Sequence, residues 1–332
     1  MVTGPARRYG ITVPFDGVPL AEHRRWFEEL VDLGYTDVWS AEVDGTDGFT
    51  PLALAAAWAP SLRLGVAIAP AYTRGPALLA QTAAAMAEAA PGRFALGIGA
   101  SSDVIVERWN GIAYAEPYAR VRDTLRFLRV ALSGEKVTAA YPSFAVDGFR
   151  LGRTVPPGEP PLYLAALRSG MLRLAGREAD GAIVNWLSAT DVATAVHEVA
   201  KGAAGAGKVG TPEIVARIFV VPEPDADAAR AIGRRMVAAY LNVPAYAEFH
   251  RWLGRGPLLQ PMWDAWGAGD RRGALAAIPD QVVDDLVVHG SPEECRAHVE
   301  RYVEGGVTVP ALMVVPGRAD LGEAVRALAP GD

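Results

Sequence analysis

The side chains that build disulfides and metal centres are scarce in this sequence of 332 residues. It contains one cysteine, Cys295, and five histidines, which form neither an HExxH motif nor a closely spaced pair. A single cysteine excludes an intrachain disulfide and a thiolate metal cluster. We expect Cys295 to be a small buried residue of a helix, and we expect the protein to bind no metal.

An excess of positive charge and long apolar runs are also lacking. The 32 Lys and Arg residues are outnumbered by 38 Asp and Glu residues, which gives a formal net charge of −6. Nucleic-acid-binding domains usually carry a basic stripe, so this balance argues against one. No window reaches the roughly 18 apolar residues of a membrane span, and no signal-peptide pattern is present. We expect a soluble, cytoplasmic protein whose partner is a small-molecule substrate, not a nucleic acid or a membrane.

Short motifs of common nucleotide-binding and hydrolytic enzymes are missing as well. There is no Walker A motif, and the segment Gly97-x-Gly99 followed by Ala100 does not complete a GxGxxG fingerprint. The sequence has no GxSxG nucleophile elbow, and no histidine lies near a loop serine. A serine hydrolase is therefore not supported.

What the chain does contain is a regular alternation of strand-like and helix-like segments. The strands are short continuous apolar runs, which is typical of a parallel sheet covered on both faces. Eight such units predict an α/β fold, a closed (β/α)8 TIM barrel in a single domain over 1–332, with a doubly wound open sheet as the alternative. We expect strands at 9–13, 36–41, 62–67, 94–98, 162–166, 181–185, 214–221 and 311–315.

Two segments are longer than a minimal barrel needs. Residues 137–161 are rich in aromatic residues and proline and predict a strand-rich excursion. Residues 243–289 contain three tryptophans and predict short helices over one end of the barrel. Long insertions in compact domains are usually functional or disordered, and the aromatic content argues against disorder. We expect the second insertion to shape a substrate pocket.

Functional residues of a TIM barrel lie on the loops that follow the strands. The most informative loop follows the apolar run Phe94–Ile98 and reads Gly99, Ala100, Ser101, Ser102. Small residues at the end of a strand let a planar ligand lie against the backbone, and a tight turn is the alternative interpretation. The other loops offer aromatic side chains and two acids, Asp16 and Glu42, which suits a flat organic cofactor.

The ordered set of segments resembles the luciferase-like monooxygenase superfamily, and within it the branch that uses the deazaflavin coenzyme F420. The resemblance covers nearly the whole chain. It rests on GYTDVWSAE (34–42), GFTPLA (48–53), LRLGVAIAP (62–70), GRFALGIGAS (92–101), VERWNGIAY (106–114), PLYLAALRSGMLRLAGREADGAI (161–183) and PDQVVDDLVVHGSPEECRAHVERYVEGGV (279–307).

The resemblance implies a set of cofactor-binding positions. It places Ala67 and Ile68 at a bulge of the third strand, with a non-proline cis peptide behind the ring and an ordinary trans bulge as the alternative. It implies that a helix N-terminus and Arg168 bind the phosphate of the cofactor's side chain. The remaining positions implied to line the cofactor are Gly99, Ala100, Ser101, Ala165, Ala166, Leu167, Ser169 and Gly170.

Candidate catalytic and substrate-binding residues also follow from the resemblance. The candidates for a proton donor or acceptor are Asp16, Glu42 and Tyr72, and those for substrate contacts are Phe15, Ser102, Trp109 and Trp186. The chain departs from the sugar-phosphate dehydrogenases of this branch, since Val43 replaces their histidine and Ser102 replaces their glutamate. Oxidation of glucose 6-phosphate is therefore not expected.

These observations predict an F420-dependent oxidoreductase that transfers a hydride between deazaflavin C5 and an organic substrate. Reduction of a C=C, C=N or C=O bond is the favoured direction. An FMN-dependent luciferase-like monooxygenase is the alternative enzyme, and a barrel that has lost its chemistry is the alternative outside enzymes. The family is commonly dimeric, which makes a homodimer an open expectation.

Overall fold

Eight parallel strands form a closed barrel in the computed structural model, which describes residues 8–156 and 158–331. Strand β1 pairs with both β2 and β11, and β8 pairs with both β7 and β9, so the ring closes without a free edge. The predicted TIM barrel is confirmed, and the open-sheet alternative is wrong. The barrel strands are β1 (Gly10–Thr12), β2 (Asp37–Ser40), β3 (Arg63–Pro70), β4 (Phe94–Gly99), β7 (Leu162–Ala165), β8 (Gly181–Asn185), β9 (Glu213–Val221) and β11 (Val309–Val314).

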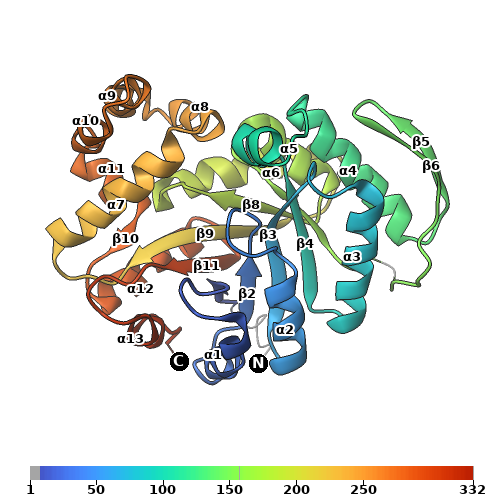
Figure 1. Cartoon of the computed structure of the whole chain (residues 1–332), viewed down its shortest axis with the longest axis horizontal. Helices are drawn as coiled ribbons and strands as arrows, with labels where there is room; N and C mark the ends of the chain where they lie inside the picture. The colour runs from blue at the N-terminus through green and yellow to red at the C-terminus, as the bar shows by residue number, and fades with distance from the viewer. Residues whose placement is uncertain (1–7, 157, 332) are drawn as a thin grey trace.

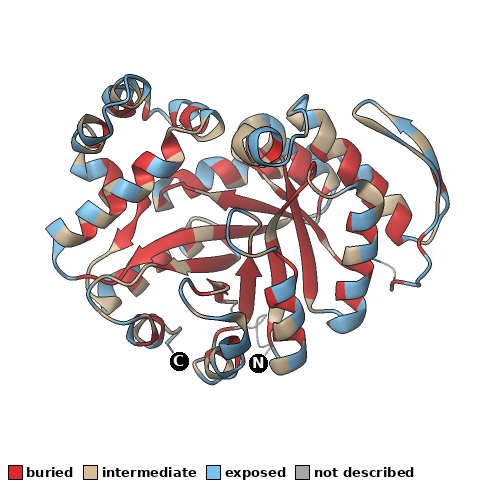
Figure 2. Ribbon diagram, viewed as in Figure 1, coloured by how far each residue is buried: buried red, intermediate tan, exposed pale blue. Residues whose placement is uncertain are grey.

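Helices cover the outside of the barrel, as Figure 1 shows. The barrel strands are largely buried, while the helices keep an exposed outer face (Figure 2). Proline occupies the first turn of α2, α3, α4 and α12, where its missing N–H costs nothing. The covering helices are α1 (His23–Asp32), α2 (Thr50–Trp58), α3 (Pro76–Ala89), α4 (Pro117–Leu132), α5 (Ser169–Glu178), α6 (Val192–Gly205), α7 (Ala226–Leu241), α12 (Pro292–Glu304) and α13 (Leu321–Ala327).

The middle of the barrel is filled by side chains that point inward from alternate strand positions. Trp39 and Tyr163 pack there in one apolar cluster with Ile183 and Val215. Gly65 makes room for the indole, because a Cβ at this position would lie 2.2 Å from ring carbons of Trp39. The barrel is thus a packed core below its open end.

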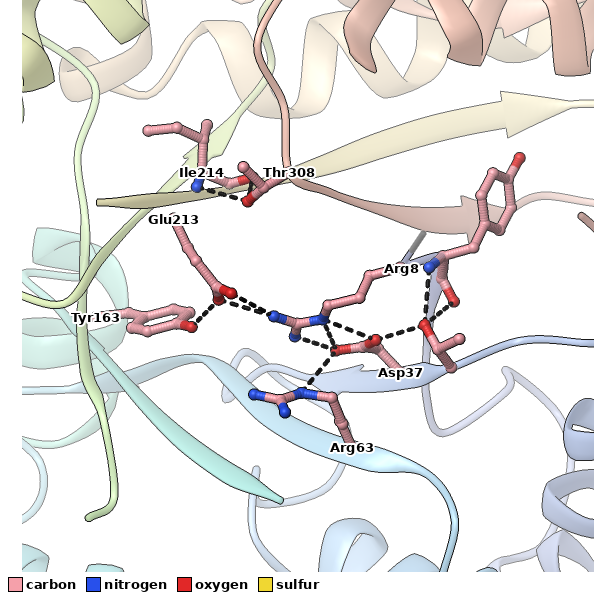
Figure 3. Close-up of polar contacts among 9 residues, drawn as sticks. Arg8, Asp37, Arg63, Tyr163, Glu213, Ile214 and Thr308 are labelled. Carbon is pink, nitrogen blue, oxygen red and sulfur yellow. Dashed lines mark hydrogen bonds and ion pairs between the residues drawn. The ribbon is translucent and has the colours of Figure 1, made fainter. Parts of the chain in front are cut away.

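A charged network closes the N-terminal end of the barrel (Figure 3). The Arg8 guanidinium donates to both carboxylate oxygens of Glu213 at 2.8 Å, and it also donates to Asp37, whose side chain is fully buried. The Tyr163 hydroxyl donates to Glu213, and Arg63 lies 4.0 Å from Asp37. This end of a TIM barrel serves stability, so the site must lie at the other end.

Both insertions contain the predicted elements. Strands β5 (Val137–Tyr141) and β6 (Phe144–Phe149) form an antiparallel hairpin. Four short helices follow α7 and lie far from that hairpin (Figure 1). They pack with α7 in an apolar cluster that includes residues at the C-terminal ends of β8 and β9. The helices are α8 (Pro244–Trp252), α9 (Gly256–Gly267), α10 (Arg271–Ala276) and α11 (Asp280–Leu286), followed by β10 (Val288–His289) on the end of β9.

Cys295 is fully buried on α12, as expected. Among the described residues, no helix is both long enough and apolar enough to cross a membrane.

Candidate active site

A wall of small side chains lies at the C-terminal ends of β3, β4 and β7. The peptide bond between Ala67 and Ile68 is cis, as predicted, at a bulge where the pairing of β3 with β4 shifts register. A Cβ on Gly99 would lie 2.9 Å from the Cβ of Ala165 and 3.1 Å from side-chain carbons of Ile68. These residues are therefore immediate neighbours, and the absence of a side chain on Gly99 makes room for those of Ile68 and Ala165.

The loop after β4 continues this wall. Ser101 adopts a left-handed backbone conformation with φ of 62°, and its carbonyl accepts a hydrogen bond from the Tyr114 hydroxyl at 3.2 Å. The Ser102 hydroxyl accepts from the N–H of Ile105 at 3.3 Å, at the start of a helical turn that ends at Trp109. Trp109 is 55% exposed, so its indole does not fill the site.

A small cavity of about 10 Å³, enough for one water molecule, lies in the barrel beside the wall. Residues of six strands line it, and one of them is the charged residue Arg217. Three polar atoms around the cavity are buried without a hydrogen-bond partner among the described residues: Thr12 Oγ1, Trp39 Nε1 and Arg217 Nε. The lining residues are Thr12, Trp39, Ser40, Ala41, Ala67, Ile183, Val215, Arg217 and Ala311.

Sequence reasoning missed Arg217. A signal for it was present, because the strand Glu213–Val221 reads EIVARIFVV and holds a single arginine within an apolar run. A charged residue in the middle of a buried strand rarely lies there without a partner or a function.

Aromatic residues cover the opposite side of the mouth. Trp186 follows β8 with φ of 54°, and its ring stacks on Phe219 at 4.2 Å and lies 5.0 Å from the ring of Tyr240. The Asn185 amide donates to the Tyr246 hydroxyl at 3.1 Å, and burial raises the pKa of Tyr246 to about 12. Trp186 is buried within this cluster, so in this structure it is a wall of the mouth and not an exposed surface.

The three candidate proton carriers have different surroundings. Glu42 is paired with Arg74, whose Nη2 lies 2.6 Å from its carboxylate, and it also accepts from the N–H of Gly48 at 3.1 Å. The Tyr72 hydroxyl donates to the carbonyl of Ala115 at 2.5 Å, and burial raises the pKa of Tyr72 to about 12.

Asp16, by contrast, is exposed on the loop after β1 and has no hydrogen bond or ion pair within the described part of the chain. Glu42 remains close to the wall, because its backbone N–H donates to the carbonyl of Ile68 at 3.2 Å.

Phe15 lies apart from the other predicted site residues. Its ring packs against α1, 5.9 Å from the ring of His23 and 5.0 Å from that of Trp26. The N–H of Phe15 donates to His23 Nε2 at 2.9 Å, and burial lowers the pKa of this histidine. The structure therefore places Phe15 behind β1, where it supports the loop that carries Asp16.

The predicted phosphate position lies at the start of α5. Arg168 precedes the helix, and no side chain caps its first turn. The Arg168 guanidinium is half-exposed and lies 3.8 Å from Glu248 of α8. Ala166 is buried, and its N–H donates to the carbonyl of Ile183. Free helical N–H groups and a nearby guanidinium therefore occur together beside Leu167, Ser169 and Gly170.

Within the described ranges, no group of three or more His, Cys, Asp or Glu side chains is arranged to hold a metal ion. The chemistry available at the barrel mouth is thus a small-residue wall, an aromatic wall, the unpaired Arg217 guanidinium and the carboxylates of Asp16 and Glu42.

Comparison with known proteins gives consistent matches over nearly the whole chain. A sequence model of a family described as luciferase-like monooxygenase matches residues 4–309. The chain is 28% identical over 303 residues to the 5,10-methylenetetrahydromethanopterin reductase of Methanolobus tindarius, covering 89% of this chain and 90% of that protein. It is 27% identical to a putative coenzyme F420-dependent oxidoreductase of Mycobacterium tuberculosis, covering 94% of each.

The fold also matches a solved structure. The coenzyme F420-dependent tetrahydromethanopterin reductase of Methanopyrus kandleri superposes with a TM-score of 0.78 over 97% of each chain, at 20% sequence identity. This likeness supports the TIM-barrel architecture.

Proposed function

Since this chain belongs to the luciferase-like monooxygenase family, we propose that it is an F420-dependent oxidoreductase that transfers a hydride between the cofactor and an organic substrate. Two relatives similar over at least 89% of this chain carry names that support this choice, a methylenetetrahydromethanopterin reductase and a putative F420-dependent oxidoreductase. Reduction of a C=C, C=N or C=O bond is the direction we favour.

The flat wall at the ends of β3, β4 and β7 is the observation that carries this proposal. A large planar ring gains contact area on an even surface, and Gly99, Ala165 and the Ile68 side chain that packs against Gly99 provide one. Ala67 and Ile68 are only half-buried, so they are accessible from the barrel mouth. The unpaired Thr12 Oγ1, which lines the cavity, supplies a polar contact for a heteroatom at a ring's edge.

The start of α5 fits the phosphate of the cofactor's side chain. The first-turn N–H groups of Ser169 and Gly170 are uncapped, and the positive end of the helix dipole favours an anion there. Arg168 adds a guanidinium that can form charge-assisted hydrogen bonds with a phosphate. These groups would hold the side chain while the wall holds the ring.

When bound, F420 supplies a hydride at ring carbon C5, and the protein must supply a proton and a dry pocket. Glu42 is held by Arg74 and Gly48, and Tyr72 directs its proton to Ala115. We therefore assign the proton exchange to Asp16, the one candidate whose carboxylate has no partner in the described residues. Glu42 then acts as a positioning residue that links the loop after β2 to Ile68.

The cofactor assignment is tested by binding. Purified protein is titrated separately with F420 and with FMN, and binding is followed by fluorescence quenching and by retention on a filter. We expect F420 to bind and FMN not to compete at equal concentration. Micromolar FMN binding without affinity for F420 would overturn the proposal and favour the FMN-dependent monooxygenase.

The wall is tested by the substitution Ala165→Leu, which places three additional carbons on the flat surface. We expect the affinity for F420 to fall at least about tenfold, because the ring can no longer lie against the wall. The matched control is Ala85→Leu on the exposed face of α3, which should leave both the affinity and the melting temperature unchanged. Unchanged affinity in a folded Ala165→Leu variant would place the ring elsewhere.

A further inference from the structure

We propose that Arg217 binds a carboxylate group of the substrate, on the side of the barrel mouth opposite the cofactor wall. This inference rests on the proposed function, since it concerns the substrate of the same site. The proposed substrate has one carboxylate group, and the rest of the molecule is apolar or aromatic.

The position of Arg217 follows from the alternation of β9. Ile214, Ala216 and Ile218 pack into the outer core between the strands and the helices, while Val215 packs inside the barrel. Residues two apart on a strand point to the same side, so Arg217 points into the barrel with Val215. Its place in the lining of the cavity agrees with this orientation.

Arg217 faces the cofactor wall from across the mouth. In the closed ring, β9 is separated from β3 by β11, β1 and β2 on one side and by β8, β7 and β4 on the other. The two strands are therefore diametrically opposed, and one cavity is lined by both Ala67 and Arg217. A substrate held by Arg217 would extend toward the wall made by Ile68, Gly99 and Ala165.

The Arg217 guanidinium has no acidic partner among the described residues. Its central carbon, Cζ, lies over the ring of Phe219, 5.0 Å from the ring centroid, and its Nε is buried without an acceptor. The other inward or buried arginines differ, since Arg8 is paired with Asp37 and Arg255 with Asp191. A partly buried charge without a counter-ion is costly, and an anionic ligand would remove that cost.

The surroundings favour a carboxylate over a phosphate. The planar guanidinium matches the two oxygens of a carboxylate, and no second Lys or Arg lines the cavity to balance a dianion. The Thr12 hydroxyl and the Asn185 amide oxygen are also buried without a partner among the described residues. Asn185 lies on β8, which pairs with β9, and Thr12 lies on β1, which is separated from β9 by β11. The Thr12 hydroxyl can donate to the bound carboxylate, and the Asn185 amide oxygen can accept from the Arg217 guanidinium, its neighbour in the sheet.

The aromatic wall defines the rest of the substrate. Phe219 follows Arg217 on the same face of β9, and Trp186 and Tyr240 stack around it. These rings form an apolar wall beside the guanidinium. An aromatic or unsaturated carboxylic acid has the matching polarity.

The test measures binding of cinnamate and of its uncharged amide to the F420-loaded protein by calorimetry, with benzoate and benzamide as a second pair. We expect each acid to bind at least about tenfold more tightly than its amide. Arg217→Gln should remove this preference, Arg217→Lys should keep part of it, and the affinity for F420 should stay within twofold. Arg24→Gln, at an exposed position of α1, is the control and should leave the preference intact.

Three results would overturn the inference. Equal affinity for acids and amides, or no binding of either, would show that the guanidinium does not recognise a carboxylate. A tenfold loss of F420 affinity in Arg217→Gln would assign the guanidinium to the cofactor. A large fall of the melting temperature in Arg217→Gln would assign it to stability, whereas removal of an unpaired charge should leave it unchanged or raised.

Failure of the proposed function is distinguishable from failure of this inference. If the wild-type protein binds no F420 but the apo-protein prefers acids to amides through Arg217, the cofactor assignment fails and the carboxylate site stands. If the protein binds F420 but shows no preference for acids over amides, the cofactor assignment stands and the carboxylate site fails.

Discussion

Arg255 ties the second insertion to the barrel, and we expect its loss to destabilise the whole chain. Its guanidinium is buried between helices α8 and α9, donating to Asp191 at 2.7 Å and to the Ser188 hydroxyl at 2.9 Å. Ser188 and Asp191 form the capping box of the helical turn that precedes α6, directly after Trp186. Arg255→Met removes the charge and retains most of the aliphatic volume.

The size of the effect can be worked from these contacts. Breaking a buried ion pair on one side costs about 3–5 kcal/mol, because the remaining charge stays buried without its partner. Asp191 keeps hydrogen bonds from the N–H and the hydroxyl of Ser188 at 2.8 and 2.7 Å, so we expect a value near about 3 kcal/mol. The unfolding entropy is about 2.1 cal/mol/K per residue, summed over 332 residues. Dividing the loss of about 3 kcal/mol by this entropy gives a melting temperature lower by about 4 °C.

Calorimetric melting of the wild type and of Arg255→Met measures this directly. Asp191→Asn and the double variant complete a double-mutant cycle, in which we expect a coupling of about 2 kcal/mol or more. The control is Arg24→Met, which removes an exposed ion pair with Glu28 and should change stability by about 0.5 kcal/mol or less. A shift below about 1 °C in Arg255→Met, or a coupling near zero, would refute the argument that this ion pair holds the insertion.

Three further substitutions test other parts of the structure. Burial and the nearby Arg255 guanidinium lower the pKa of His250 to about 4. The free energy of unfolding of the wild type should therefore fall by up to about 3 kcal/mol between about pH 6.5 and pH 4. Urea titrations across this range should show a smaller fall for His250→Phe. Tyr72→Phe should cost about 1 kcal/mol and leave the pH profile of turnover unchanged, because the hydroxyl stays protonated and serves a backbone carbonyl. Gly65→Ala should cost about 1–3 kcal/mol, because its Cβ would overlap the ring of Trp39.

Each of these predictions has a control and a contrary outcome. His197→Gln changes an exposed histidine of α6 and should leave the acid dependence as in the wild type, whereas an unchanged dependence in His250→Phe would contradict the assigned cause. A folded Tyr72→Phe variant without turnover would make this hydroxyl a proton donor. Gly75→Ala, where a Cβ meets no atom within 4 Å, is the control for Gly65→Ala, and equal melting temperatures of both variants would show that Trp39 can move.

Sequence alone predicted the barrel because each of its elements has a strong local signal. The continuous apolar runs defined the parallel strands, and proline marked the first turns of the helices after them. The strand Gly181–Asn185 has the predicted bounds. Strand β3 runs to Pro70, three residues beyond its predicted end, because the bulge at Ala67 and Ile68 is followed by renewed pairing with β4.

The predicted cofactor wall came from small residues and from resemblance, and its members do lie together. Gly99, Ala165 and Ile68 come from three strands, and their contact depends on the pairing of β3 with β4 and of β4 with β7. The candidate proton carriers were not separable by sequence. Their surroundings differ through contacts with Arg74 and Ala115, which no spacing along the chain could reveal.

Local sequence therefore determined which segments are strands, which are helices and which loops are built of small residues. It could do so because hydrophobic periodicity and backbone freedom act over a few residues. Tertiary structure alone decided which charges are satisfied. Closure of the barrel pairs Arg8 and Arg255 with carboxylates and leaves Arg217 facing the cavity, because charge pairing depends on distances between strands that are remote in sequence.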